Sequence, residues 1–489
     1  MRNHYAAVVS ILAFVVGCTG QEDPHAGVEA GADNIVVDAV FAEWDVPGSP
    51  GCAVAVAEDG ALIYSRGYGY ANLDYDIPIT SQTVFDVASV TKQFNAASII
   101  MLAQEGKLSL DDNVREWLPE LPEYEWPITL RHMLQHTSGL RDYLVLFPLA
   151  GRDDYYPISH PQILAMMSRQ RALVSRPGDQ YRYSNTAFML LSQVIERVSG
   201  LTLGEITETR IFGPLGMNDS FMYENLAEIV PRRSTGYILD DDGRVRIVHN
   251  YNFDVAGDGQ LYSTMEDLLI WDNYLHGAVK PAIHPLMLAE GFLNNGDRLG
   301  HSQGLRRREY RGLQTVGHGG SSWGFRTELI RFIAPGLSIA ISCNMGDVNP
   351  QYLAKKVADH YLADQLAPRI DAEASEQDQE DTDETPAPPT LTPEQLAEFA
   401  GSFFSPELDA SYRIAVVDGG LSVRIEQEPP MAVVPVSEDR FEIEFQPDGW
   451  SESDTITLEF DRNRAGAVNG FGLSMGQELG IVFEKGEGR

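Results

Sequence analysis

The sequence predicts an α+β protein with two folded domains, and three observations indicate this class. The chain has 489 residues, which is more than a single ordinary core holds. Strand-like segments lie at both ends of residues 35–368 with helical segments between them, so we expect one antiparallel sheet flanked by helices. Residues 391–489 alternate apolar and polar side chains with a period of two, which predicts an all-β domain, either a sandwich or a barrel.

The N-terminus carries the features of an export signal. The apolar run 6–17 follows a basic residue, has the length of a signal-peptide core and is too short to span a membrane. The segment VVGC resembles a bacterial lipobox, so we expect a lipid anchor on Cys18 as the only membrane contact; a plain secretory signal or an uncleaved anchor is the alternative. We therefore assign residues 1–18 to the signal and lipobox and residues 19–34 to a flexible tether, and expect a protein of the periplasm or cell envelope.

The larger domain opens with a predicted hairpin. Two apolar strands, 53–57 and 62–69, are joined by a Glu-Asp-Gly turn. A second cluster of apolar segments near the end of the domain predicts three further strands, at 314–316, 325–333 and 337–343.

Two cysteines follow Cys18, and each lies in a strand-like run. Cys52 belongs to the first hairpin and Cys343 to the last strand of the domain. In an oxidising compartment they pair if these strands are antiparallel neighbours; two buried free thiols are the alternative.

A predicted buried helix over residues 89–105 holds a single lysine near its start. Ser89 and Lys92 stand at i and i+3, which places both side chains on one face of the helix. Burying an ammonium without a partner is costly, and a desolvated lysine beside a serine hydroxyl is one way to activate a weak nucleophile. The alternative is a lysine in the first turn that reaches solvent.

A second patch, YRYSN, precedes the apolar helical run that starts near residue 187. It places Tyr183 and Asn185 at a helix N-terminus, where backbone N–H groups and the helix dipole favour an anion. A phenol held beside an ammonium is suited to shuttle a proton. A helix cap with a packed tyrosine is the alternative.

A third patch, VGHGGSSWG over residues 316–324, reads as a strand that ends in glycines. The missing side chains let a ligand approach the backbone, and exposed N–H groups of such an edge can stabilise an oxyanion. A glycine-rich turn between two strands is the alternative.

Two histidines, His132 and His136, stand four residues apart in the segment LRHMLQHTSGL. Two imidazoles are too few for a metal site, and the sequence offers no clear third ligand. We therefore predict a structural helix end stopped by Gly139, and no metal or organic cofactor.

Together, four ordered patches resemble the serine β-lactamase-related superfamily. The patches are FDVASVTK, LQHTSGL, YSN and HGG, and the resemblance covers roughly residues 35–365. The branch is that of class C β-lactamases, D-alanyl-D-alanine carboxypeptidases, D-aminopeptidases and some esterases. The resemblance implies a β-lactamase/transpeptidase-like fold for the larger domain.

The resemblance also implies a role for each residue of these patches. Ser89 would be the acylated nucleophile, with Lys92 and Tyr183 sharing the general acid and base work. Asn185 would bind a polar group of the substrate, and the backbone N–H groups of Ser89 and Ser321 would form the oxyanion hole.

His318 departs from the lysine that β-lactamases usually carry at the start of the triplet His318, Gly319 and Gly320. A lysine is a fixed cation for a substrate carboxylate, whereas a histidine carries charge only near or below a pKa of about 6.5. We therefore expect a D-amino-acid peptide or a carboxylic ester to be a better substrate than a β-lactam.

The acidic residues 369–390 contain several prolines and no apolar cluster, so we assign them to a solvated linker. The C-terminal β-domain, 391–489, resembles the small barrel modules appended to D-aminopeptidase-like proteins. Such a module could wall the active site, bind a ligand, or serve stability or solubility.

The net charge of the chain limits the kinds of partner that it can bind. A net charge of −35 argues against nucleic-acid binding, because phosphate binding needs a basic face. The partners we expect are small-molecule or peptide substrates, including fragments derived from peptidoglycan. The function predicted is that of an exported serine hydrolase; the alternative is a catalytically idle envelope protein that binds peptidoglycan stems or a protein partner.

Overall fold

The computed structural model describes residues 32–152, 156, 158–240, 242–248, 253–369, 389, 391–445, 454–475 and 478–486. The predicted signal and lipobox with its Cys18 anchor, nearly all of the tether and nearly all of the acidic linker lie outside these residues. Within them, none of the helices combines the length and the apolar character that crossing a bilayer requires.

The centre of the larger domain is a six-stranded antiparallel sheet built from both ends of the domain, as predicted. The N-terminal hairpin lies beside the strand cluster from the end of the domain. Its first strand pairs on one side with its own second strand and on the other side with the last strand of that cluster. In spatial order the strands are β10 (Arg306–Tyr310), β11 (Leu313–Ser322), β12 (Phe325–Phe332), β13 (Leu337–Cys343), β1 (Cys52–Glu58) and β2 (Ala61–Tyr68).

Cys52 and Cys343 face each other across the β1–β13 ladder and form a disulfide. The sequence left open whether they pair. Their pairing follows from the register, which places the first residue of β1 opposite the last residue of β13.

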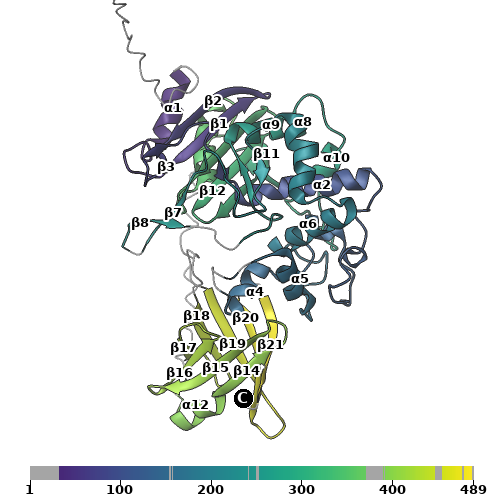
Figure 1. Cartoon of the computed structure of the whole chain (residues 1–489), viewed down its shortest axis with the longest axis vertical. Helices are drawn as coiled ribbons and strands as arrows, with labels where there is room; N and C mark the ends of the chain where they lie inside the picture. The colour runs from purple at the N-terminus through teal and green to yellow at the C-terminus, as the bar shows by residue number, and fades with distance from the viewer. Residues whose placement is uncertain are drawn as a thin grey trace, which may run out of the picture.

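Helices cover both faces of the sheet (Figure 1). On one face, α1 (Ala32–Phe41) and α11 (Pro350–Tyr361) pack against the large side chains of the strands, such as Val54. On the other face, the small side chain of Ala55 belongs to the core that contains α2 (Thr91–Gln104) and α9 (Met265–His276). Because side chains alternate along a strand, β1 can present valines to one layer and alanines to the other.

Two predicted boundaries are wrong. The buried helix expected from residue 89 begins at Thr91, and Ser89 lies in the preceding single turn, η1 (Ala88–Val90). The tether expected through residue 34 overlaps α1, which begins at Ala32.

The remaining elements of the larger domain are short strands and helices between β2 and β10. The strands are β3 (Tyr70–Asn72), β4 (Ile77–Pro78), β5 (Phe85–Asp86), β6 (Phe221–Met222), β7 (Gly236–Leu239), β8 (Val245–Val248) and β9 (Leu261–Ser263). The helices are η2 (Val114–Glu116), α3 (Leu130–Leu134), α4 (Tyr143–Leu149), α5 (His160–Ser168), α6 (Asn185–Ser199), α7 (Leu203–Thr207), η3 (Glu208–Phe212), α8 (Gly213–Leu215) and α10 (His284–Met287).

The C-terminal domain is a closed antiparallel barrel that follows one short helix, α12 (Pro393–Phe399). The period-two pattern places one face of each strand inside; Phe441 and Ile443 of one strand, for example, are fully buried. The strands are β14 (Gly401–Ser405), β15 (Ala410–Val417), β16 (Gly420–Ile425), β17 (Met431–Pro435), β18 (Arg440–Phe445), β19 (Asp454–Arg462), β20 (Val468–Met475) and β21 (Glu478–Lys485).

The barrel contacts the larger domain next to α4 (Figure 1). The buried hydroxyl of Tyr412 on β15 donates a hydrogen bond of 2.8 Å to the backbone carbonyl of Leu149. A buried ion pair between Arg141 and Glu407 also joins the two domains. The barrel is therefore packed against the larger domain at the start and end of α4.

Candidate active site

Ser89 lies in a tight turn that joins β5 to α2. The residue before it, Ala88, has a φ of +49°, a left-handed conformation that is strained for a residue with a side chain. The backbone N–H of Ala88 donates to Asp86 Oδ1 at 2.8 Å, and the hydroxyl of Thr91 donates to the Ala88 carbonyl at 2.6 Å. These bonds hold the turn that leaves the Ser89 side chain half-buried at the start of the helix.

Lys92 is fully buried one turn after Ser89, and its ammonium has three acceptors. Nζ donates to Ser89 Oγ at 3.0 Å, to Asn185 Oδ1 at 3.0 Å and to the backbone carbonyl of Asp258 at 2.7 Å. Three N–H groups meet three neutral oxygens, so every donor of the ammonium is satisfied. The structure therefore excludes the alternative that the Lys92 side chain reaches solvent.

Tyr183 lies beside Lys92 through its ring. The ring centroid is 4.9 Å from Lys92 Nζ, and the ring stacks on His136 at 4.4 Å. Within the described part of the chain, the phenolic oxygen makes no hydrogen bond to Ser89 or Lys92. A cation–π contact therefore relates Tyr183 to Lys92 in this state.

Asn185 is the first residue of α6, as the sequence predicted. Ser184 is the N-cap of this helix, and its hydroxyl accepts a hydrogen bond from the Ala187 N–H at 3.1 Å. The backbone N–H of Asn185 donates to Asp142 Oδ2 at 2.6 Å. This pair of contacts fixes the helix start and with it the Asn185 side chain that reaches Lys92.

The glycine-rich patch is part of a strand, which corrects the expectation that the strand ends there. β11 runs through the glycines to Ser322, but its pairing with β10 stops at Gly317. A Cβ on Gly320 would lie 2.2 Å from the Val87 carbonyl oxygen, so only glycine lets β11 approach the Ser89 turn this closely. Ser321 is exposed at this edge.

His318 lies on β11 near Tyr183, with ring centroids 6.1 Å apart. Its Nδ1 lies 2.6 Å from the Gly319 carbonyl, so Nδ1 is the donor. Burial, followed by the charges of Arg306 and Lys92, holds the pKa of His318 well below its usual value. The imidazole is therefore neutral at pH 7 and offers no fixed cation.

The other two histidines of interest make backbone contacts. His132 Nδ1 accepts the Thr129 N–H at 3.2 Å, and His136 Nδ1 accepts the Ser184 N–H at 3.1 Å. Burial, with the charge of Lys92 next in size, holds the pKa of His136 well below its usual value. In the part of the chain that the structure describes, no three His, Cys, Asp or Glu residues are grouped in a way that could hold a metal.

Sequence reasoning missed three residues that border this site. Asp86 accepts a hydrogen bond of 2.6 Å from the Ser322 hydroxyl and so ties the Ser89 turn to β11. Asp258 supplies a backbone acceptor to Lys92, and the guanidinium of Arg306 lies 5.8 Å from the Tyr183 ring centroid. Arg306 had a signal, since it opens a run of three arginines in an acidic chain, and Asp86 lies in the patch FDVASVTK; Asp258 had none.

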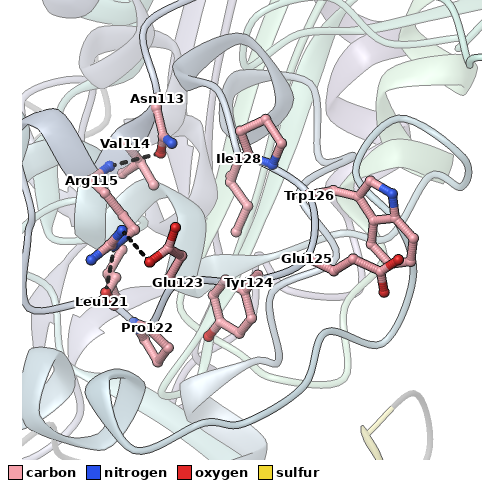
Figure 2. Close-up of a pocket in the computed structure, with 11 residues that line it drawn as sticks. Asn113, Val114, Arg115, Leu121, Pro122, Glu123, Tyr124, Glu125, Trp126 and Ile128 are labelled. Atoms are coloured by element: carbon pink, nitrogen blue, oxygen red, sulfur yellow. Dashed lines mark hydrogen bonds and ion pairs between the residues drawn. The ribbon is translucent and has the colours of Figure 1, made fainter.

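A separate cavity of about 190 Å³ lies in the loop around η2 (Figure 2). Its lining comes from one stretch of chain, and Arg115 there bonds to the Leu121 carbonyl at 2.9 Å. None of the residues around Ser89 lines it. It contains no serine and no lysine, so it does not have the groups that the chemistry of Ser89 needs.

The fold and the Ser89–Lys92 pair define a serine hydrolase with a β-lactamase/transpeptidase-like fold. A family model described as Beta-lactamase matches residues 37–362, and the chain belongs to this family. The resemblance inferred from the four sequence patches is thereby confirmed.

The curated relatives are penicillin-binding proteins and D-aminopeptidases. Penicillin-binding protein 4* of Bacillus subtilis (strain 168) is 30% identical over 326 residues, which cover 63% of this chain and 71% of the relative. A D-aminopeptidase of Gluconobacter oxydans (strain 621H) is 28% identical over 297 residues, which cover 60% of this chain and 56% of the relative. The chain therefore spans little more than half of that D-aminopeptidase.

Solved structures share the fold. The octameric penicillin-binding protein homologue from Pyrococcus abyssi superposes with a TM-score of 0.59 at 23% identity and covers 92% of this chain and 98% of its own. The D-amino acid amidase from Ochrobactrum anthropi SV3, complexed with D-phenylalanine, has a TM-score of 0.57 at 23% identity and covers 68% and 99%. The predicted α+β fold with a C-terminal barrel is confirmed, and so is the serine hydrolase class.

Proposed function

We propose that the protein is an exported serine hydrolase that forms an acyl-enzyme on Ser89 and cleaves an amide or ester. The observation that carries this proposal is the buried side-chain nitrogen of Lys92, whose Nζ lies 3.0 Å from both Ser89 Oγ and Asn185 Oδ1. A serine hydroxyl needs a neighbouring group to take its proton, and here that group is held in place by three hydrogen bonds.

The reaction has two halves. Ser89 Oγ attacks the substrate carbonyl carbon, its proton passes to Lys92 in its neutral amine form or to Tyr183 in its phenolate form, and the oxyanion is stabilised by the backbone N–H groups of Ser89 and Ser321. The bond to the leaving group then breaks, and the leaving amine or alcohol takes the proton. A water molecule attacks the Ser89 ester in the second half, the same groups remove its proton, and the acid product leaves with Ser89 regenerated.

Amides of D-amino acids and carboxylic esters are the substrates we propose, in preference to β-lactams. The neutral His318 supports this choice, because at its own position on β11 it gives a β-lactam carboxylate no fixed cation. The names of the relatives, D-aminopeptidase and D-amino acid amidase, point in the same direction. We further propose that Arg306, next to Tyr183, binds a carboxylate where a substrate carries one.

We propose export to the cell envelope with a lipid anchor on Cys18. The signal and lipobox pattern of residues 1–18 supports this location. The Cys52–Cys343 disulfide supports it as well, because disulfides persist in oxidising compartments and are rare in the cytosol.

Covalent labelling tests the nucleophile. The chain without residues 1–18 is incubated with a fluorophosphonate probe and with a fluorescent penicillin, beside Ser89→Ala and Lys92→Ala, and adducts are read by intact mass. Ser98→Ala is the matched control, since Ser98 is a buried serine of α2, the helix that carries Lys92, and its hydroxyl donates to the Phe94 carbonyl at 2.9 Å. We expect one fluorophosphonate adduct on wild type and on Ser98→Ala, and none on Ser89→Ala.

Substrate choice is then measured with four chromogenic compounds: the p-nitroanilides of D-alanine and L-alanine, p-nitrophenyl acetate and a chromogenic cephalosporin. We expect turnover of the D-alanine amide or the ester to exceed that of the cephalosporin by at least 100-fold in kcat/KM. A folded wild type that takes neither label contradicts the proposal and favours the idle binding protein, which is then tested against peptidoglycan fragments.

A further inference from the structure

Glu407 of the barrel is buried in the larger domain. It lies in the loop between β14 and β15, and its carboxylate pairs with Arg141 at 3.2 Å, with side chains only 3% and 1% exposed. The Arg171 N–H donates to its other oxygen at 2.7 Å, and the Gln170 amide donates to its backbone carbonyl at 3.0 Å. A glutamate with hydrogen bonds to both carboxylate oxygens and to its backbone carbonyl has little freedom to move.

Arg141 is the first of three consecutive residues that lead from Glu407 to the active site. The second, Asp142, accepts the backbone N–H of Asn185 at 2.6 Å. Thr186 locks the same two segments together, because its hydroxyl donates to the Arg141 carbonyl at 2.9 Å and accepts the Tyr143 N–H at 2.8 Å. Residues 141–143 therefore set the position of the helix start that carries Asn185.

The third residue, Tyr143, reaches the other side of Lys92. Its buried hydroxyl lies 3.2 Å and 3.3 Å from the two carboxylate oxygens of Asp258, whose backbone carbonyl accepts from Lys92 Nζ. Asn185 Oδ1 and the Asp258 carbonyl are two of the three acceptors of the Lys92 ammonium. Segment 141–143 thus contacts both residues that orient Lys92 toward Ser89.

We propose that Glu407 is a positioning residue for catalysis: the barrel orients Lys92 and Asn185 by fixing Arg141. The pair suits this task because separating Arg141 from Glu407 would leave a buried charge without its partner, which costs free energy. The two side chains therefore favour one relative position. The proposal rests on the Ser89 nucleophile proposed above. It gives the barrel a part in the chemistry although Glu407 touches neither the substrate nor the reacting atoms.

The test compares Glu407→Ala and Glu407→Gln with Tyr412→Phe in the chain without residues 1–18. Tyr412→Phe is the matched control, because it removes another buried hydrogen bond across the same interface but leaves Arg141 untouched. Two quantities are measured for each folded protein: the second-order rate constant of fluorophosphonate labelling, and the final amount of label per chain. A merely structural role lowers the final amount, whereas a positioning role lowers the rate.

For Glu407→Ala we expect the rate constant to fall at least tenfold while the label still reaches one per folded chain. Glu407→Gln keeps the shape and one accepting oxygen, so its rate should lie between wild type and Glu407→Ala. The Tyr412→Phe rate should stay within twofold of wild type. In an Arg141→Gln background, Glu407→Gln should have no further effect on the rate.

Amide hydrogen exchange tests the same idea without catalysis. The peptide that contains the Asn185 N–H should exchange at least tenfold faster in Glu407→Ala, and at the wild-type rate in Tyr412→Phe. Rates and exchange equal to those of the control in both Glu407 variants would overturn the proposal and leave Glu407 as an interface contact. If wild type takes no label, the nucleophile proposal fails, and exchange alone still decides whether Glu407 positions Asn185.

Discussion

Asp86 and Ser322 are 236 residues apart in the chain, yet the Ser322 hydroxyl donates a hydrogen bond of 2.6 Å to Asp86 Oδ2. The other oxygen of the same carboxylate accepts the Ala88 N–H. Asp86 is buried, and burial raises its pKa while the Ser322 and Ala88 hydrogen bonds lower it. One carboxyl group therefore connects the two walls of the site, the Ser89 turn and the end of β11.

Replacing Asp86 with Ala should loosen this connection. The Ala88 N–H and the Ser322 hydroxyl lose their acceptor, and an unsatisfied buried polar group costs about 1–3 kcal/mol. We expect the free energy of unfolding in urea to fall by about that amount and Ser89 labelling to slow by at least tenfold. Ser322→Ala removes only one of the two donors and should have the smaller effect on both. Equal labelling rates in wild type and Asp86→Ala would contradict this role.

Gly320→Ala should close the gap between β11 and the Ser89 turn. The new Cβ would lie 2.2 Å from the Val87 carbonyl oxygen, so the strand has to move away from the turn. We expect labelling of Ser89 to fall by at least 100-fold. Gly472→Ala is the control, since Gly472 is also a strand glycine and a Cβ there meets nothing within 4 Å. The prediction fails if the two alanine variants label at the same rate.

Asp258 should make stability depend on pH. Burial raises the pKa of Asp258 to about 6, whereas the unfolded chain releases this proton near its ordinary pKa of about 4. The native state then binds more protons than the unfolded state between these values, so stability falls as the pH rises from about 4 to about 6. The loss is about 2–3 kcal/mol in total.

Urea unfolding of wild type and Asp258→Asn between pH 4 and pH 8 measures this effect. The stability of wild type relative to Asp258→Asn should decrease across the window and level off above it. A difference that does not change with pH would show that Asp258 titrates normally. Tyr143→Phe, which removes the hydroxyl donor to Asp258, should leave the sign of the dependence unchanged.

The disulfide should contribute substantially to stability. Cys52 and Cys343 are separated by 291 residues, and closing a long loop in the unfolded chain stabilises a protein by about 2–5 kcal/mol. We expect Cys52→Ala with Cys343→Ala to lower the free energy of unfolding by that order. A reductant should destabilise wild type to the same level and leave the double variant unchanged.

Arg306→Gln should affect substrates according to their charge. We expect KM to rise by about 10–100-fold for a substrate with a free carboxylate, which corresponds to losing one charge-assisted hydrogen bond, and to change little for p-nitrophenyl acetate. Arg308→Gln is the control, since Arg308 lies on the same strand and is exposed. A KM increase of the same size for the neutral ester would argue against a carboxylate contact.

The sequence predicts those parts of the site that are local in the chain. Ser89 and Lys92 are three residues apart, and the helix start at Asn185 follows from its N-cap and the apolar run after it. Spacing placed the residues of each patch close together, and the resemblance of the four ordered patches implied their catalytic roles. The strand pattern at both ends of the larger domain was likewise enough to predict its central sheet.

Contacts between distant segments could not be predicted in this way. Glu407 meets Arg141 across 266 residues, and nothing near either residue indicates the other. The glycines of β11 resembled a strand end because glycine weakens strands in general. Here they continue the strand, since close approach to the Ser89 turn excludes any side chain at Gly320.

The position of β1 in the sheet also constrains the order of folding. β1 lies between β2, which follows it directly in the chain, and β13. The paired residues Cys52 of β1 and Cys343 of β13 are 291 residues apart in the chain. During synthesis, which starts at the N-terminus, the edge of β1 that faces β13 therefore stays unpaired until almost the whole larger domain has been made. Pairings of such high sequence separation form slowly, so the larger domain completes its central sheet late in folding.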